Sequence, residues 1–420
     1  MRQPHLLRCL LVAAIGLVVP SLCLAQAASQ APAQTPAQTP PRAIRIMVLN
    51  DQSSTNAAAS GQGSVTAAKL AADDFGGTVA GMPIIILGAD HQNKADIAST
   101  TARKGFEVDE VDAIFDLSNS AASLAVQDIA RERNKIVVHV GSAVSDLYGK
   151  ACSPTGAMWL YDSYSLARGL TKAIYAEGGT TWFFLTADYA FGKALESEVN
   201  RTLTSLGGKM LGAVRHPIGN SDFSSFLLQA QAANPKVIGL ASGGDDPMNM
   251  LKQAREFGMS GTVKFATFIF YLNYVKALGP EVAKGLQYLS GYYWERDDGS
   301  RAFAQRFAAQ SKGNMPTEVH AGVYSAVHHY LRAVAQTKSH DGLVNMRQMK
   351  AMPLDDFFSP GATIRADGRL MNDQFLVEAK GPDEVKGPWD ILKVLRTIKA
   401  AEIVRPIEDG GCQYLDGPTK

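Results

Sequence analysis

From Ile44 onward, short apolar runs alternate with longer amphipathic segments, and this alternation limits the possible folds more than any other feature. Runs such as Ile44–Leu49, Ala113–Phe115 and Ile136–Val140 predict buried strands, and intervening segments such as Ala121–Arg131 have helical spacing. Strands that alternate with helices form parallel sheets whose two faces are both covered. We therefore predict an α/β fold with doubly wound parallel sheets.

The same alternation resumes after a break around Cys152–Tyr164, so the chain carries two similar α/β blocks in tandem. Late in the chain, Gln374–Ala379 and Ile391–Leu395 predict an antiparallel pair. The second block has four predicted strands, namely Thr181–Leu185, Lys209–Val214, Val237–Leu240 and Val263–Ala266.

The N-terminus has the order of regions that is typical of a secretory signal peptide, with basic residues before an apolar run. Arg2 and Arg8 precede an uncharged run, Cys9–Pro20. This run is shorter than a membrane-spanning helix, which needs roughly 20 apolar residues. We expect a cleaved signal peptide over residues 1–25 and a periplasmic location. Residues 26–42 are rich in Ala, Gln, Thr and Pro and predict a flexible linker.

Charge and cysteine content narrow the class of protein. The chain has 41 Lys and Arg against 40 Asp and Glu, which gives no support for a nucleic-acid or anionic-membrane partner. Of the 4 cysteines, Cys152 and Cys412 lie beyond the signal peptide. An even pair in an exported protein suggests a disulfide bond, and two free thiols are the alternative.

Motifs of common enzyme classes are missing from the sequence. It contains no H-E-x-x-H, C-x-x-C, P-loop or G-x-S-x-G motif, and no G-x-G-x-x-G follows the first strand. His328 and His329 are adjacent, so on a helix they would point about 100° apart and would not form a metal-binding pair. We expect no metal, no cofactor and no catalytic residues, although a triad of distant residues stays open.

Five local segments, in this order, resemble the leucine/isoleucine/valine-type solute-binding proteins of ABC importers. The resemblance covers nearly the whole chain after residue 43. The segments are Ile44–Leu49 with Ser60–Gly63 and Ala71–Gly77, Ala113–Ser120, Thr186–Gly192, Ser221–Phe226 with Ala233–Ile238, and Leu251–Gly258.

This resemblance implies a type I periplasmic-binding-protein fold, with two doubly wound lobes and a ligand cleft at the C-terminal ends of the strands. Lobe 1 would comprise residues 43–160 and 294–362, and lobe 2 residues 161–293 and 363–420. Three crossing strands would join the lobes, near Trp159–Tyr164, Leu289–Glu295 and Ala362–Arg365.

In lobe 1, the resemblance places two loops at the ligand. Ser118, Asn119 and Ser120 follow a strand and precede a helix, where hydroxyls and backbone N–H groups suit a carboxylate. Plain N-capping by Ser120 is the alternative. The second loop follows the next strand and could equally be a simple turn; it consists of Gly141, Ser142 and Ala143.

In lobe 2, the resemblance places an aromatic ring over the ligand, which here is Phe191 with Tyr189 as a neighbour. The alternative role for these rings is core packing at the start of the helix. Asp245 is a further candidate ligand-binding residue, although an acid at a helix N-terminus is also explained by the helix dipole.

One departure from the family pattern concerns the ligand. Amino-acid-binding members place an acid after the strand that corresponds to Val263–Ala266, whereas this chain has the aromatic residues Phe268 and Phe270 there. Burying an ammonium without a partner is costly, so we favour a small organic carboxylate such as an aromatic acid. An amino acid held by Asp245 or Asp246, and a sensor that docks on a signalling partner, are the alternatives. The implied partners are ABC permease subunits in the inner membrane, and we expect a monomer.

Overall fold

The computed structural model describes residues 41–259 and 261–415. The predicted signal peptide (1–25) and all but the last two residues of the predicted linker (26–42) lie outside the described residues. The strands are β1 (Ile44–Asn50), β2 (Thr78–Val79), β3 (Met82–Asp90), β4 (Ala113–Asp116), β5 (Ile136–His139), β6 (Gly156–Met158), β7 (Thr181–Ala187), β8 (Lys209–His216), β9 (Val237–Ala241), β10 (Lys264–Thr267), β11 (Gln287–Ser290), β12 (Gln374–Ala379) and β13 (Leu392–Ile398).

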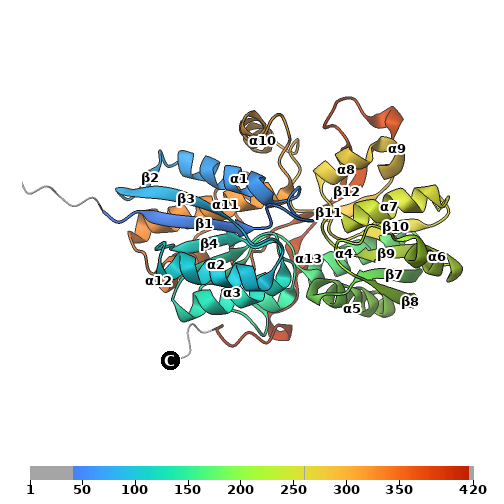
Figure 1. The fold of residues 1–420 in the computed structure, drawn as a ribbon, viewed down its shortest axis with the longest axis horizontal. Coiled ribbons are helices and arrows are strands. Elements are labelled where there is room, and N and C mark those ends of the chain that lie inside the picture. The colour runs from blue at the N-terminus through green and yellow to red at the C-terminus, as the bar shows by residue number, and fades with distance from the viewer. Residues whose placement is uncertain (1–40, 260, 416–420) are drawn as a thin grey trace, which may run out of the picture. The chain divides into compact units, whose positions relative to one another are not determined.

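Helices follow most of these strands, as the alternation of apolar runs and amphipathic segments predicts (Figure 1). The helices are α1 (Gly61–Asp73), α2 (Ala95–Glu107), α3 (Ser120–Glu132), α4 (Ser163–Ala176), α5 (Ala190–Ser205), α6 (Ser224–Ala232), α7 (Asp246–Glu256), α8 (Leu272–Leu278), α9 (Pro280–Ala283), α10 (Asp298–Gln310), α11 (Glu318–Thr337), α12 (Gly342–Ala351) and α13 (Ala400–Ile403).

Five of these elements were not predicted, and all are short: β2, β6, α8, α9 and α13. Strand β6 has only 3 residues, and it lies inside the segment that the sequence marks as a break. Helices α8 and α9 have 7 and 4 residues, too few for a helical period to be visible in the sequence.

The strands form two separate sheets, which confirms the predicted α/β fold class. The first sheet has the order β2-β3-β1-β4-β5-β6, and the second has the order β13-β12-β11-β10-β9-β7-β8. We call each sheet with its helices a lobe: lobe 1 contains the first sheet and lobe 2 the second. In Figure 1, α1 and α11 lie on one face of the first sheet and α2 and α3 on the other.

Strand β1 of the first sheet is buried on both faces, and consecutive residues of a strand point in opposite directions. Ile46 and Val48 of β1 lie in the core shared with α1 and α11. Met47 and Leu49 pack into a second core with residues of α2 and α3. A strand that is buried on both faces has to be largely apolar, which explains the run Ile46–Leu49 in the sequence.

The second sheet is parallel in its centre and antiparallel at one edge. Strands β7, β8, β9, β10 and β11 pair in parallel, and β12 pairs antiparallel with both β11 and β13. The late antiparallel pair predicted from Gln374–Ala379 and Ile391–Leu395 is therefore confirmed. Trp182 and Phe184 of β7 stack with Phe268 inside this sheet's core.

The chain passes between the sheets between β6 and α4, between β11 and α10, and between α12 and β12. The first two passages coincide with the predicted crossings. The third differs from the predicted Ala362–Arg365, because Arg369 still pairs with Met158 of the first sheet. The reason is a tight turn in which Ile364 pairs back with Leu370, so the chain crosses only after this turn.

The first and third passages are joined by a buried ion pair. Arg369 Nε donates to Asp162 Oδ2 at 3.0 Å, and both side chains have 0% exposure. Asp162 Oδ1 also accepts from the Tyr148 hydroxyl at 2.9 Å. The same Asp162 oxygen accepts from Ser165 N and so caps α4. This ion pair links the two lobes at the point where the chain passes between them.

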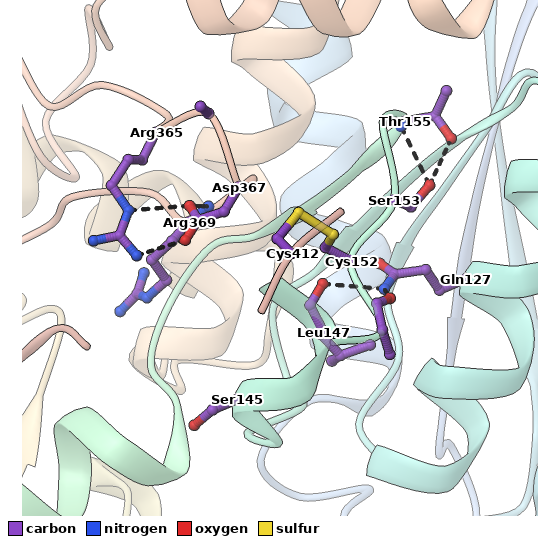
Figure 2. The surroundings of a disulfide bond; sticks show 12 residues. Gln127, Ser145, Leu147, Cys152, Ser153, Thr155, Arg365, Asp367, Arg369 and Cys412 are labelled. Carbon is purple, nitrogen blue, oxygen red and sulfur yellow. Dashed lines mark hydrogen bonds and ion pairs between the residues drawn. A yellow bond between two sulfur atoms is a disulfide. The ribbon is translucent and has the colours of Figure 1, made fainter. Parts of the chain in front are cut away.

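A disulfide bond joins Cys152 to Cys412, one of the two alternatives that the sequence left open (Figure 2). Before it, Arg405 donates from Nη2 to Ser145 O at 3.0 Å and lies over the Tyr148 ring. The tail thus contacts lobe 1, whereas the sequence-based division assigned all of 363–420 to lobe 2. The lobe boundaries at residues 160, 293 and 362 themselves stay a prediction.

Candidate functional site

A cavity lies between the two lobes, beyond the C-terminal ends of strands β4, β5, β7, β9 and β10. Both lobes contribute to its lining, which consists of Asn56, Ser118, Ser120, Gly141, Ala143, Tyr189, Phe191, Gly243, Ile269 and Tyr271.

The cavity measures only about 20 Å³. That is room for little more than a water molecule, and pockets for small organic ligands usually measure about 300–1,000 Å³. The lobes therefore stand close together in this structure, and they have to separate before a small organic molecule can enter.

On the lobe 1 side, the loop before α3 gives each of its residues a different role. Asn119 caps α3, since its Oδ1 accepts from Ala122 N at 2.9 Å, and its Nδ2 donates to Asn93 Oδ1 at 2.6 Å. Ser120 is therefore not the N-cap that the alternative interpretation proposed. Ser118 and Ser120 line the cavity instead, at the positive end of the α3 dipole.

The second lobe 1 loop touches the first. Ser142 Oγ donates to Ser120 Oγ at 3.4 Å, so Ser142 is buried behind the lining rather than in it. A Cβ atom at Gly141 would lie 2.7 Å from Asp116 Oδ1. Only glycine, which has no Cβ atom, avoids this close contact. Gly141 and Ala143 both line the cavity.

The backbone that leads into the first loop is strained. Asp116 has φ 83° and Leu117 has φ 59°, a region that costs side-chain-bearing residues about 1–3 kcal/mol each. Asp116 is fully buried, and Asn50 Nδ2 donates to its Oδ2 at 2.9 Å. Burial raises the pKa of Asp116 to about 6, although its hydrogen bonds oppose this shift. Such strain, next to the cavity, is typical of a binding site.

On the lobe 2 side, two aromatic rings flank the start of α5. Tyr189 and Phe191 line the cavity together, with their ring centroids 5.8 Å apart. The Tyr189 hydroxyl lies 3.5 Å from the position that a Cβ atom at Gly243 would occupy. The lining therefore combines hydroxyls and the N-termini of α3 and α5 with apolar ring faces.

The segment after β10 differs from the prediction. Phe268 and Phe270 are buried in the core of lobe 2, where Phe270 packs on Tyr274 and Tyr288. The residues that line the cavity are instead Ile269 and Tyr271. In extended backbone, neighbouring side chains point to opposite sides, so the residues beside the predicted ones face this cavity. Ligand contact by Phe268 and Phe270 stays a prediction.

Comparison with known proteins identifies the family. A family model described as periplasmic binding protein matches residues 43–384. The chain belongs to the periplasmic binding protein family. This family provides solute-binding receptors of ABC transporters and works in the periplasm. The chain matches none of the curated protein sequences.

Several solved periplasmic binding proteins are similar to this one. A periplasmic binding protein from Burkholderia mallei is 42% identical, with a TM-score of 0.86, and the match covers 88% of this chain and 98% of that one. A branched-chain amino acid ABC transporter periplasmic ligand-binding protein from Burkholderia xenovorans is 39% identical, with a TM-score of 0.79 over 88% and 99%. An R. palustris solute-binding protein in complex with benzoate is 18% identical, with a TM-score of 0.78 over 88% and 99%, and it shows the shared fold.

In this periplasmic binding protein, the predicted site residues divide into two groups. The lining contains Ser118, Ser120, Gly141, Ala143, Tyr189 and Phe191. The structure places the others outside the lining, and these are Asn119, Ser142, Asp245, Phe268 and Phe270.

Asp245 stands at the N-terminus of α7 without a side-chain capping bond. Burial raises its pKa, and the nearby Asp51 carboxylate of lobe 1 raises it further, while Lys252 opposes both. Its neighbour Asp246 accepts from Gly219 N at 3.1 Å, and burial raises the pKa of Asp246 to about 6. The two acids lie beside the cavity rather than in its lining.

Sequence reasoning missed four lining residues: Asn56, Gly243, Ile269 and Tyr271. Asn56 belongs to a loop that Asp51 organises, since Asp51 accepts from Ser54 N and Asn56 N, both at 2.9 Å. The polar run after the first strand was a usable signal for this loop. Nothing in the sequence distinguishes Gly243 from the other glycines.

Two hydrogen bonds connect lobe 2 with lobe 1 and with the first passage between the lobes. Asn273 Nδ2 of lobe 2 donates to Ala58 O of lobe 1 at 2.8 Å. The hydroxyls of Tyr161 and Tyr271 lie 2.6 Å apart. The bond from Asn273 to Ala58 joins the two lobes, and the Tyr161–Tyr271 pair joins the first passage to lobe 2.

The described residues contain no group of three or more His, Cys, Asp or Glu side chains arranged to hold a metal ion. Within the same residues, no helix is both long and apolar enough to cross a bilayer.

Proposed function

We propose that this periplasmic binding protein captures a small aromatic carboxylate between its lobes and presents it unchanged to ABC permease subunits. The observation that carries the proposal is that the two lobes contribute different kinds of side chain to the cavity lining. Lobe 1 contributes the hydroxyls of Ser118 and Ser120 at the start of α3, and lobe 2 contributes the rings of Tyr189 and Phe191.

The carboxylate would bind at the lobe 1 loops. Ser118 and Ser120 supply hydroxyl donors, and the first N–H groups of α3 point out of the helix with the positive end of its dipole. Each charge-assisted hydrogen bond is about twice as strong as a neutral one. The described lining offers a carboxylate these donors and contains no Lys or Arg side chain.

The aromatic ring would lie among the lobe 2 side chains. Tyr189, Phe191 and Tyr271 offer ring faces and edges, and Ile269 adds an aliphatic surface. The lining has no carboxylate among the described residues, so an α-ammonium group would find no ionic partner there. This favours an acid without an amine, and the benzoate complex of the R. palustris protein is consistent with it.

Closure follows from this two-sided arrangement. A ligand bound to lobe 1 gains the aromatic contacts of lobe 2 only when the lobes meet, so it shifts the population to the closed form. A ligand that binds the closed form about 5.5 kcal/mol more favourably than the open form would move the ratio of closed to open protein from 1:99 to 99:1.

A branched-chain or other amino acid is the second candidate. The 39% identical B. xenovorans relative carries that description, and Asp245, two residues after the lining residue Gly243, would supply the carboxylate for an ammonium group.

We expect benzoate to raise the melting temperature by several degrees and to reduce the radius of gyration in X-ray scattering, because it binds only the folded, closed form. Leucine should cause neither change. Stabilisation by leucine without a response to benzoate would refute the aromatic-acid proposal. Recovery of benzoate chemically unchanged after long incubation would support a receptor over an enzyme.

A further inference from the structure

Glu318 is an acidic residue buried where the two lobes meet. It is the first residue of α11 in lobe 1, and only 4% of its surface is exposed. Its Oε2 accepts from Gly291 N at 2.5 Å and from Ser290 Oγ at 3.2 Å, at the end of β11 in lobe 2. One carboxyl group therefore joins a helix of the first lobe to the second sheet.

The Glu318 carboxyl faces a narrow cavity with tyrosine walls. Tyr271, Tyr288 and Tyr292 from the lobe 2 side line this cavity, and Pro316 lines it from lobe 1. Tyr271 also lines the ligand cavity, so Glu318 lies one side chain away from the proposed ligand.

No cation pairs with Glu318 among the described residues. The titratable groups that face it are the phenols of Tyr161, Tyr271 and Tyr288, whose own pKa values lie well above the neutral range. Both ring nitrogens of His320, on the same helix, have other hydrogen-bond partners: Nε2 lies 2.9 Å from Ser60 O, and Nδ1 accepts from Thr317 N. An ionised carboxylate buried without a counter-charge is costly.

Burial raises the pKa of Glu318 from 4.5 to about 8, although the hydrogen bonds from Gly291 and Ser290 oppose this shift. With the lobes together, the carboxyl is therefore mostly neutral at pH 7. Because the walls of its cavity come from both lobes, separation of the lobes would admit water and return the pKa towards its ordinary value.

We propose that Glu318 is the site at which closure of the lobes takes up a proton, so that proton binding and solute binding reinforce each other. The proposal rests on the hinge closure inferred above, and it assigns Glu318 no contact with the solute.

The sign of the pH dependence follows from the two protonation states. Between pH 4.5 and about 8, the closed form binds more protons than the open form, so closure weakens as the pH rises. At most, the equilibrium constant for closure falls about tenfold for each unit by which the pH rises. Asp116 and Asp246 have pKa values of about 6, so a pH range above theirs isolates Glu318.

The test is calorimetric titration of the purified protein with benzoate between about pH 6.5 and about pH 8, in buffers that differ in ionisation enthalpy. We expect affinity to fall about tenfold over this range, with uptake of nearly one proton near neutral pH. Glu318→Gln, which mimics the neutral acid, should bind with a pH-independent affinity and take up no proton. Glu132→Gln, on the exposed end of α3, is the matched control and should behave as the wild type.

X-ray scattering of the ligand-free protein separates this proposal from the identity of the ligand. The wild type should contract as the pH falls through the same range, and Glu318→Gln should not respond. If benzoate fails to bind but this contraction occurs, the aromatic-acid proposal fails and the role of Glu318 stands. If Glu318→Gln keeps the wild-type pH response, or if the wild type has none, the role of Glu318 is refuted.

A second variant covers the case in which Glu318→Gln does not fold. Ser290→Ala removes a hydrogen bond that lowers the pKa of Glu318, so it should move the pH midpoint of the scattering change upwards. An unchanged midpoint would count against the proposal.

Discussion

At the scale of single residues, Gly141 links the strained strand end to the ligand cavity. A Cβ atom there would lie 2.7 Å from Asp116 Oδ1 and 3.1 Å from Ser118 Cα. Asp116 is fully buried in a close-packed interior and cannot move aside at little cost. The shape of the cavity at the lobe 1 loops therefore depends on one missing side chain.

We expect Gly141→Ala to destabilise the fold by about 1–3 kcal/mol through overpacking. It should also weaken benzoate binding by about tenfold or more, since a shift of Ser118 costs the hydrogen bonds to the carboxylate. Thermal melts and calorimetry would measure the two effects.

The matched control is Gly387→Ala, because a Cβ atom at Gly387 would meet open space. It should leave both quantities unchanged. Equal behaviour of the two alanine variants would contradict the steric role of Gly141.

At the scale of elements, the Asp162–Arg369 pair fastens the start of α4 to the turn before β12. Both side chains are fully buried, and Arg369 Nη1 also donates to Asn372 Oδ1 at 3.1 Å. Asp162 accepts from Tyr148, Ser165 and Arg369, so its lone pairs are well used. Because its polar atoms are hydrogen-bonded, this buried pair fixes the first and third passages relative to each other.

We expect Asp162→Asn to lower the free energy of unfolding by about 3–5 kcal/mol, because it leaves the Arg369 charge buried and unpaired. Urea denaturation would measure the change. Asp298→Asn removes the partner of Arg301 in an exposed pair and should leave stability unchanged within error. A small effect of Asp162→Asn would show that Arg369 finds other acceptors.

At the scale of the whole molecule, the C-terminal tail adds a further connection between the lobes. Helix α13 packs beside α4 in lobe 2, with Arg168 Nε donating to Glu402 O at 3.0 Å. A few residues later, Arg405 binds Ser145 O, and Cys412 is bonded to Cys152 in lobe 1. The disulfide closes a loop with a sequence separation of 260 residues, which includes the whole of lobe 2.

We expect the double variant Cys152→Ser, Cys412→Ser to be less stable than the wild type by about 2–5 kcal/mol, because the unfolded chain regains the freedom that a long closed loop removes. A thiol reductant should lower the wild-type melting temperature towards that of the double variant and leave the double variant unaffected. An identical melting temperature for wild type and double variant would contradict a stabilising disulfide.

The candidate site was predictable where local order defines it. The loops at Ser118–Ser120 and at Gly141–Ala143 were found because each follows a recognisable buried strand. Which serine or asparagine caps α3 was not predictable, since that depends on backbone angles. Which residues after β10 face the cavity was not predictable either, because a one-residue change of register turns every side chain to the opposite face.

The amino-acid sequence by itself determined the α/β class and the two tandem blocks, because hydrophobic periods are local properties of a chain. Only the tertiary structure decided what faces the cavity and what is buried beside it. The contacts that matter there join distant residues, such as Tyr161 with Tyr271, which are 110 positions apart. Burial of Glu318 likewise needs both lobes, so no local pattern could reveal its raised pKa.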